Sequence, residues 1–147
     1  MDDLPSSVLF ACSLNSVRSP MAEALAKRLY GARVFVDSAG VHAGDIDGFA
    51  VAVLDEIGVD LHRHHVKTFD DVDPGEFDVI VSLSPEAHHR ALEATRDVAT
   101  RVEYWPLPDP SAVDGDRERR LEAYRALRDL IQRRLRARFG APGGVDL

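Results

Sequence analysis

Short apolar segments alternate with segments of helical periodicity along this chain of 147 residues. Parallel strands need a crossover connection, usually a helix, and strands buried on both faces read as continuous apolar runs. The alternation therefore predicts an α/β fold, a three-layer sandwich with a four-stranded parallel sheet between helices on both faces. The predicted strands lie at 8–11, 34–36, 79–81 and 102–105.

Helical segments follow each of these strands. The first has Pro20 in its opening turn, where the missing N–H costs no helical hydrogen bond, and Gly58 is a stop signal for the second. The last is the most clearly amphipathic, with an apolar stripe and arginines and acids over the rest of its surface. The predicted helices span 19–29, 49–57, 85–94 and 117–139.

Composition narrows the class of protein. Hydrophobic residues make up 45% of the chain and charged residues 29%, as in ordinary globular domains, so we expect one domain over 1–147 with an ordered core at about 7–139. A net charge of −7 argues against general binding of nucleic acid or of an anionic membrane. The acidic start, Met1 to Pro5, does not resemble a signal peptide, and no stretch approaches transmembrane length.

The chain contains a single cysteine, Cys12. It cannot form an internal disulfide or a multi-cysteine zinc site, and we expect a cytoplasmic protein that needs no metal or cofactor. His62, His64 and His65 form a cluster, but histidines on a loop are more often solvated imidazoles than metal ligands. The arginines of the last helix alternate with acids, which is typical of a solvated face.

Cys12 directly follows the first predicted strand, at the edge of the sheet where ligands bind in open α/β folds. Five residues separate it from Arg18, and a helix is predicted from about Ser19. A loop that curls into a helix N-terminus turns backbone N–H groups toward its centre, and an arginine adds a planar fork for a tetrahedral oxyanion. The same positive field favours the thiolate, which is the nucleophilic form. Asn15 tolerates the left-handed backbone of so tight a curl.

An isolated cysteine at a strand end is more often a buried, inert residue. Arg18, Ser19 and the strand–loop–helix setting favour a nucleophile at Cys12 instead.

The motif Cys12-x5-Arg18-Ser19, continuing as Pro-Met-Ala-Glu-Ala, resembles the low-molecular-weight protein tyrosine phosphatases and the arsenate reductases that share their fold. Asp37 to Gly40, Gly58 to Asp60 with His64 downstream, and Asp109-Pro110 match in order, so the resemblance covers about 8–139. It implies a phosphocysteine or a thiol-arsenate intermediate.

The resemblance also implies roles for individual residues. Cys12 is the nucleophile, and Ser19 donates a hydrogen bond to its sulfur. Asp109 is the general acid and then the base that activates water, although an Asp between two prolines is also a common turn. Asp114 and Asp116 are the nearby alternatives, and they are also candidates for the start of the last helix. The oxyanion is held by Arg18 and by backbone N–H groups of Ser13, Leu14, Asn15, Ser16 and Val17, and the loop is supported by Asn15, Ser38 and His64. The alternative to loop support is that Ser38 is only a turn residue and that His64 is a surface imidazole.

Four features of this chain depart from the family pattern. Val17 stands where the phosphatases often carry a further cysteine, so an oxidised Cys12 cannot be rescued as a disulfide. Leu14 replaces a usual glycine, and a positive φ there would strain a leucine. Ser111 and Ala112 follow Asp109-Pro110, where phosphotyrosine-preferring members carry tyrosines. The region of Ser82 to Ser84 contains only serines where thioredoxin-coupled reductases place resolving cysteines, so an internal thiol relay is excluded.

The sequence favours a phosphomonoester hydrolase of the protein tyrosine phosphatase type, acting on a phosphorylated protein or a small phosphomonoester. Phosphate, vanadate and arsenate are the expected oxyanion ligands. The alternative is a single-cysteine arsenate reductase that uses an external thiol; Trp105 and the Asp-Pro pair before an arginine-rich helix look closer to that branch. A non-catalytic oxyanion-binding or interaction domain is the least favoured hypothesis.

Overall fold

Four short strands form one parallel sheet in the computed structural model, which describes residues 4–142. The strand order β2-β1-β3-β4 places β1 in the interior, between β2 and β3. The predicted α/β architecture is confirmed. The ends of the predicted single domain, residues 1–3 and 143–147, lie outside the described residues. The strands are β1 Ser7–Cys12, β2 Phe35–Gly40, β3 Val79–Ser82 and β4 Arg101–Tyr104.

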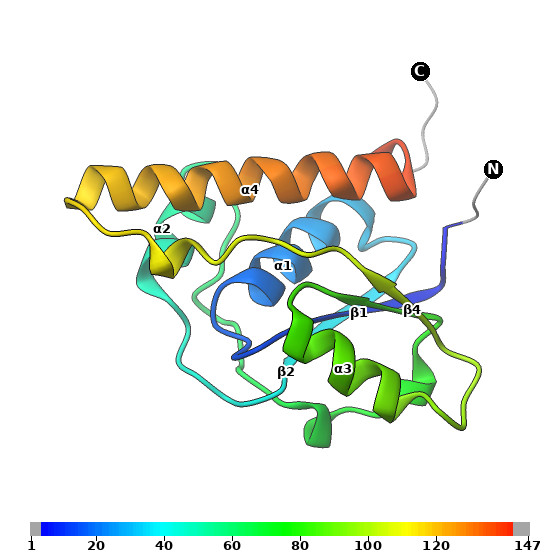
Figure 1. Cartoon of the computed structure of the whole chain (residues 1–147). Helices are drawn as coiled ribbons and strands as arrows, with labels where there is room; N and C mark the ends of the chain where they lie inside the picture. The colour runs from blue at the N-terminus through cyan, green and yellow to red at the C-terminus, as the bar shows by residue number, and fades with distance from the viewer. Residues whose placement is uncertain (1–3, 143–147) are drawn as a thin grey trace.

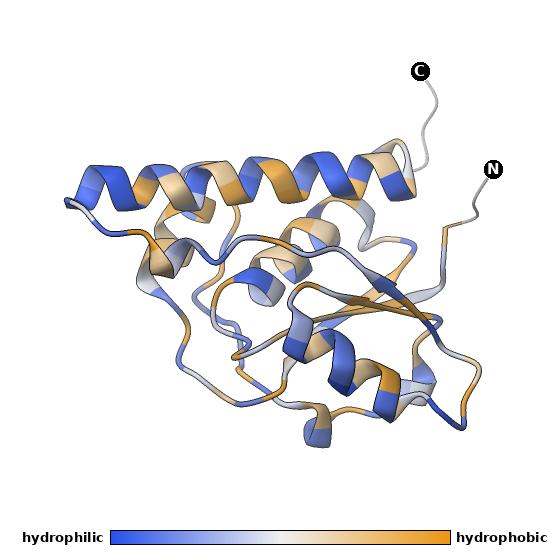
Figure 2. Ribbon diagram, viewed as in Figure 1, coloured by the Kyte–Doolittle hydropathy of each residue, from blue (hydrophilic) through white to orange (hydrophobic). Residues whose placement is uncertain are grey.

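The side chains of β1 alternate between two cores, because successive residues of a strand point to opposite faces. Val8, Phe10 and Cys12 join the larger core, and Leu9 and Ala11 join the smaller one. The larger core is formed with α1 Arg18–Tyr30, α2 Gly48–Asp55 and α4 Arg117–Phe139, and the smaller with α3 Pro85–Ala94. Figure 1 shows the resulting three layers, and in Figure 2 the apolar strands lie between the helices.

Three of the helices, α2, α3 and α4, begin at residues whose side chains cap them. Asp47 accepts hydrogen bonds from two N–H groups of the first turn of α2, and Ser84 and Asp116 do the same once each for α3 and α4. The second helix, expected over 49–57, ends at Asp55, and a turn with Gly58 at φ 75° follows. Three short 3-10 helices complete the path, η1 Phe69–Asp71, η2 Pro74–Glu76 and η3 Pro110–Ala112.

The connections from β1 place a crevice at its carboxyl end. The chain leaves β1 through α1 to reach β2 on one side, and β3 pairs with β1 on the other side. In open α/β sheets ligands bind where the strand order reverses in this way. Cys12 is the last residue of β1 and therefore lies in that crevice.

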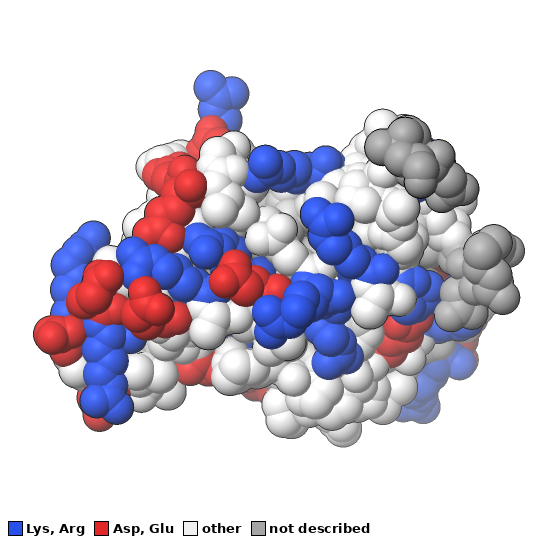
Figure 3. All heavy atoms as spheres, turned by 90° about the horizontal axis from the view of Figure 1, so that it is seen from above, with Lys and Arg blue, Asp and Glu red and all other residues white. Residues whose placement is uncertain are grey.

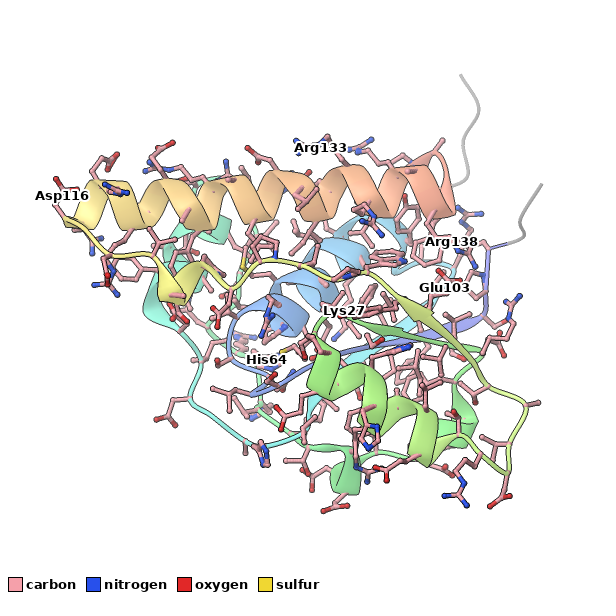
Figure 4. All side chains as sticks on the ribbon, in the orientation of Figure 1. Lys27, His64, Glu103, Asp116, Arg133 and Arg138 are labelled. Atoms are coloured by element: carbon pink, nitrogen blue, oxygen red, sulfur yellow. The ribbon has the colours of Figure 1, made fainter. Side chains whose placement is uncertain are left out.

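The outer surface of α4 is charged along its length. Arg125 and Arg128 both pair with Glu56 at the end of α2, and Arg138 pairs with Glu103 of β4 (Figure 4). Seen from this side, basic and acidic side chains are interspersed at the N-terminal end of the helix (Figure 3). None of the helices within 4–142 is long and apolar enough to cross a membrane.

Candidate active site

We call the segment between Cys12 and Arg18 the oxyanion loop (13–17). Most of its carbonyl groups accept hydrogen bonds from a neighbouring segment of the chain. The extended segment 41–47, after β2, donates N–H groups to the carbonyls of Cys12, Ser13, Leu14 and Ser16 at 2.8 to 3.1 Å. None of the N–H groups of 13–17 donates to the described part of the chain. These donors are therefore available to a ligand at the helix N-terminus, which is the arrangement that binds phosphate-like anions.

The curl of the loop depends on two backbone positions. Asn15 has φ 54°, the only positive value among the described residues other than glycine, as its position in the loop predicts. Leu14 is not among the positive-φ residues, so the strain considered for it is absent. Its side chain is 46% exposed and packs against Gly44. The leucine is tolerated because its backbone does not need a positive φ.

The sulfur of Cys12 is hydrogen-bonded to Ser19 at the start of α1, at 2.9 Å. Asn15 Nδ2 donates to Ser19 Oγ at 2.8 Å, so the hydroxyl oxygen already accepts a hydrogen bond. The hydroxyl hydrogen of Ser19 is then free to point at the sulfur. This geometry allows Ser19 to donate a hydrogen bond to the Cys12 sulfur, which is the role predicted for Ser19.

Asn15 is held from behind by a buried polar network. Its second Nδ2 hydrogen goes to Ser38 Oγ at 2.9 Å, and its Oδ1 lies 2.9 Å from His64 Nε2 and accepts from the N–H of Lys67. Ser38 in turn donates to Glu23 of α1. Every hydrogen-bonding position of this buried amide is used, so the left-handed backbone of the loop is fixed by side chains from three other segments.

His64 is buried in this network, with its side chain only 4% exposed, and Nδ1 lies 3.6 Å from Glu23 Oε1. Burial lowers the pKa of His64 below its ordinary value of 6.5, and the opposing effect of Glu23 is smaller. The alternative of a surface imidazole is therefore wrong for His64. It does describe His62, which is exposed and bonded to Asp60. No group of three His, Cys, Asp or Glu side chains in the described chain could hold a metal ion.

Asp109 faces Cys12 across a pocket of about 140 Å³. Its Oδ1 accepts from the N–H and the hydroxyl of Ser111, so it caps η3 as a turn residue does. Within the described residues Oδ2 has no hydrogen-bond partner, which leaves one carboxylate oxygen for chemistry. The turn and the catalytic interpretations of Asp109 are compatible. Lining the pocket are Cys12, Ser13, Leu14, Ser16, Val17, Arg18, Asp109 and Ser111.

Arg18 connects the two sides of the pocket. Its Nη1 donates to the carbonyl of Leu107 at 3.2 Å, in the segment that carries Asp109. The guanidinium is thereby oriented before any oxyanion binds, which lowers the entropy that binding costs.

The structure brings the predicted residues together as two groups. The first group lines the pocket and consists of Cys12, Arg18, Asp109 and most of the oxyanion loop. The second group lies behind the loop and consists of Asn15, Ser19, Ser38 and His64. Trp105 is not at the pocket; it packs in the core against Phe10 and Phe139.

Sequence reasoning missed three residues of the site. Glu23 is a buried carboxylate one helical turn after Ser19, and an acid among the apolar positions of the first helix was the available signal. Ser84 Oγ lies 3.1 Å from Ser13 Oγ, and Asp47 donates its N–H to the Ser16 carbonyl. Both come from segments far away in the sequence, so no local pattern indicates them.

Comparison with known proteins identifies the family of this chain. The profile of the low molecular weight phosphotyrosine protein phosphatase family matches residues 7–141. The chain belongs to this family. An arsenate reductase of Halalkalibacterium halodurans is 33% identical over 129 residues, which cover 88% of this chain and 91% of that protein.

Solved structures of the family superpose over most of the chain. An arsenate reductase in a phosphate-binding state has a TM-score of 0.74 and 26% identity, covering 90% of this chain and 95% of that one. A tyrosine phosphatase of Erwinia amylovora has a TM-score of 0.75 at 21% identity, covering 92% and 91% of the two chains. This low-molecular-weight phosphatase family member is thus an enzyme of the phosphatase and arsenate reductase class.

Proposed function

We propose that this family member is an arsenate reductase that transfers arsenic from Cys12 to an external thiol. The observation that carries the proposal is the setting of the thiol: Cys12 is 2% exposed, at a pocket that would hold the oxyanion, and the 147 residues contain no second cysteine. The identity to arsenate reductases at 33% and 26%, over most of each chain, supports the choice of arsenic over phosphorus. This reverses the order of the two functions weighed from the sequence.

In the first step the oxyanion loop and Arg18 hold arsenate with its arsenic against the sulfur. The Cys12 thiolate attacks arsenic, an As–O bond breaks, and Asp109 donates a proton so that the oxygen leaves as water. The product is a cysteinyl arsenate, still As(V), and its charge is held by the N–H groups of the loop.

In the second step an external thiol enters from the pocket mouth. The buried sulfur of Cys12 is shielded by the arsenic, so the thiol attacks arsenic in line with the S–As bond. Asp109 takes the thiol proton, the S–As bond to Cys12 breaks, and the thiolate is regenerated. Arsenic leaves as a thiol–As(V) adduct.

A second thiol completes the reduction. It attacks the sulfur of the adduct, the electron pair of that S–As bond passes to arsenic, and the products are a disulfide and arsenite. The sum is arsenate plus two thiols giving arsenite, one disulfide and water. Because the reaction consumes reduced thiol, we place it in the cytoplasm, where thiols are kept reduced.

The test is arsenite formation by the purified protein with arsenate and a small thiol, beside Cys12→Ser and Asp109→Asn. We expect no turnover for Cys12→Ser, and for Asp109→Asn a decrease of about 10²- to 10⁴-fold, the usual contribution of a general acid–base group. Arg133→Gln, on the exposed surface of α4, is the matched control. A lysine closer to the site, Lys67, is unsuitable because it pairs with Asp37 beside the buried network.

Phosphomonoester hydrolysis is the second candidate, because water could replace the thiol in the second step and Asp109 lines the pocket with Cys12. Hydrolysis of p-nitrophenyl phosphate that depends on Cys12, together with no arsenite formation under any thiol, would make phosphatase the function. Vanadate binding with neither activity would indicate the non-catalytic domain.

A further inference from the structure

Two arginines at the start of α4 are stacked on one aromatic ring. The guanidinium carbons of Arg117 and Arg120 lie 5.4 and 4.6 Å from the ring centroid of Phe49, and the ring itself packs on Tyr124 at 5.3 Å. The arginines are one helical turn apart, so both reach the same ring. Stacking fixes their planes and leaves the edge N–H groups free to donate.

Neither arginine has an ion-pair partner in the part of the chain that the structure describes. The neighbouring acids Glu118 and Glu122 pair with Arg125 instead, and Asp116 accepts from a backbone N–H of the helix. Arg125, in contrast, has three carboxylates around it. The pair at Phe49 is therefore a positioned cationic site without an anion.

The segments that carry this site contact segments that line the active-site pocket, although Phe49, Arg117 and Arg120 do not line it themselves. Asp47, two residues before Phe49, donates its N–H to the carbonyl of Ser16, and Ser16 lines the pocket. On the other side η3, which presents Ser111 to the pocket, packs against α4.

Tyr124 connects the same segments, because its ring packs on Phe49 and its hydroxyl donates to Asp47 Oδ2 at 2.8 Å. Burial and its hydrogen bond to Asp47 raise the pKa of Tyr124; Asp109 acts in the same direction and Arg120 in the opposite one. The carboxylate of Asp109 and the guanidinium of Arg120 thus both lie within electrostatic range of one hydroxyl.

We propose that Arg117 and Arg120 bind a carboxylate of the external thiol, so that the co-substrate is an anionic, carboxylate-bearing low-molecular-weight thiol. The inference rests on the proposed function. The arsenic oxyanion is already matched by Arg18 and the loop N–H groups, so a second anion bound outside the pocket belongs to the molecule that enters it. A pair of guanidinium forks suits a carboxylate, and binding it outside the pocket leaves the thiol free to reach arsenic.

The experiment compares 3-mercaptopropionate with 3-mercaptopropionamide, two thiols of the same size that differ by the carboxylate. Arsenite formation is measured for the wild type, for Arg117→Gln/Arg120→Gln and for Arg133→Gln. Arg133 lies on the same helix, about 20 Å along its axis from Arg120 and about 24 Å from Arg117 at 1.5 Å per residue, and points away from the sheet (Figure 4). Urea unfolding of all three proteins shows whether each is folded.

We expect the wild type to have a KM for the carboxylate thiol at least about 10-fold below that for the amide, the equivalent of one charge-assisted contact. The double variant loses that preference through KM with kcat unchanged, its use of the amide is unaffected, and Arg133→Gln behaves as the wild type.

Equal use of the two thiols by the wild type, or a preference that survives in the folded double variant, would overturn the inference while leaving the reductase intact. Absence of arsenite with either thiol would instead mean that the proposed function has failed. The two failures are therefore distinguishable.

Discussion

At the scale of single residues, the shape of the oxyanion loop depends most on Asn15. Its backbone is left-handed and its side-chain amide makes four hydrogen bonds, to Ser19, Ser38, His64 and the N–H of Lys67. Since the penalty of a left-handed residue is offset by contacts to distant segments, the strain persists only while those contacts do. The proposed chemistry at Cys12 therefore depends on side chains that lie behind the loop rather than in the pocket.

His64 makes this network sensitive to pH. Its pKa lies below 6.5 in the folded protein because burial disfavours the imidazolium, whereas in the unfolded chain it returns to its ordinary value. Between the two values the unfolded chain binds more protons, so the free energy of unfolding decreases as pH falls below about 6.5. The decrease is expected to be smaller in His64→Gln. Urea unfolding of both proteins between pH 7.5 and 5.5 measures it, and identical pH slopes would contradict the prediction.

At the scale of elements, the oxyanion loop takes its shape from the segment that follows β2. The N–H groups of 41–47 hold the loop carbonyls, which requires the two backbones to approach closely at Gly40. A Cβ at Gly40 would lie 2.5 Å from the carbonyl oxygen of His42 and 2.7 Å from the nitrogen of Asn15, and neither backbone atom can move alone.

Gly40→Ala is thus predicted to weaken phosphate binding at least about 10-fold and to cost about 1–3 kcal/mol of stability, as overpacking does. The matched control is Gly48→Ala, because a Cβ at Gly48 meets nothing within 4 Å. Calorimetric titration with phosphate and urea unfolding measure the two effects. Normal phosphate affinity in Gly40→Ala would show that the segment does not shape the loop.

At the scale of the whole molecule, the pocket is assembled from both halves of the chain. Cys12 and Arg18 come from the first crossover, while Asp109 and Ser111 come from the connection between β4 and α4. Arg18 binds the carbonyl of Leu107, so the two halves are already joined without a ligand. We expect an oxyanion in the pocket to bridge them and to bind only the folded chain.

Phosphate is therefore expected to stabilise the whole fold, by about 2.7 kcal/mol at 100 times its Kd. The shift of the urea midpoint with phosphate measures this stabilisation. Arg18→Gln lacks the guanidinium that would bind phosphate, so we expect its midpoint to shift little. A phosphate-dependent shift of equal size in Arg18→Gln would place the anion somewhere else.

The sequence alone determined the features that local rules control. Hydrophobic periodicity predicted the four strands and four helices, and the Cys-x5-Arg-Ser spacing after the first strand predicted the oxyanion loop, with Asn15 in its left-handed position. These succeed because strand alternation, helix starts and backbone preference act between residues close in the chain.

Only the tertiary structure decided which side chains complete the site. Glu23 supports the network as a buried carboxylate, His64 lies in the interior rather than on the surface, and Asp47 and Ser84 contact the loop from other crossovers. Arg117 and Arg120 meet Phe49 across a separation of about 70 residues. Such contacts depend on where the sheet order brings the crossovers together, and a parallel sheet joins segments whose separation in sequence leaves no periodic signal.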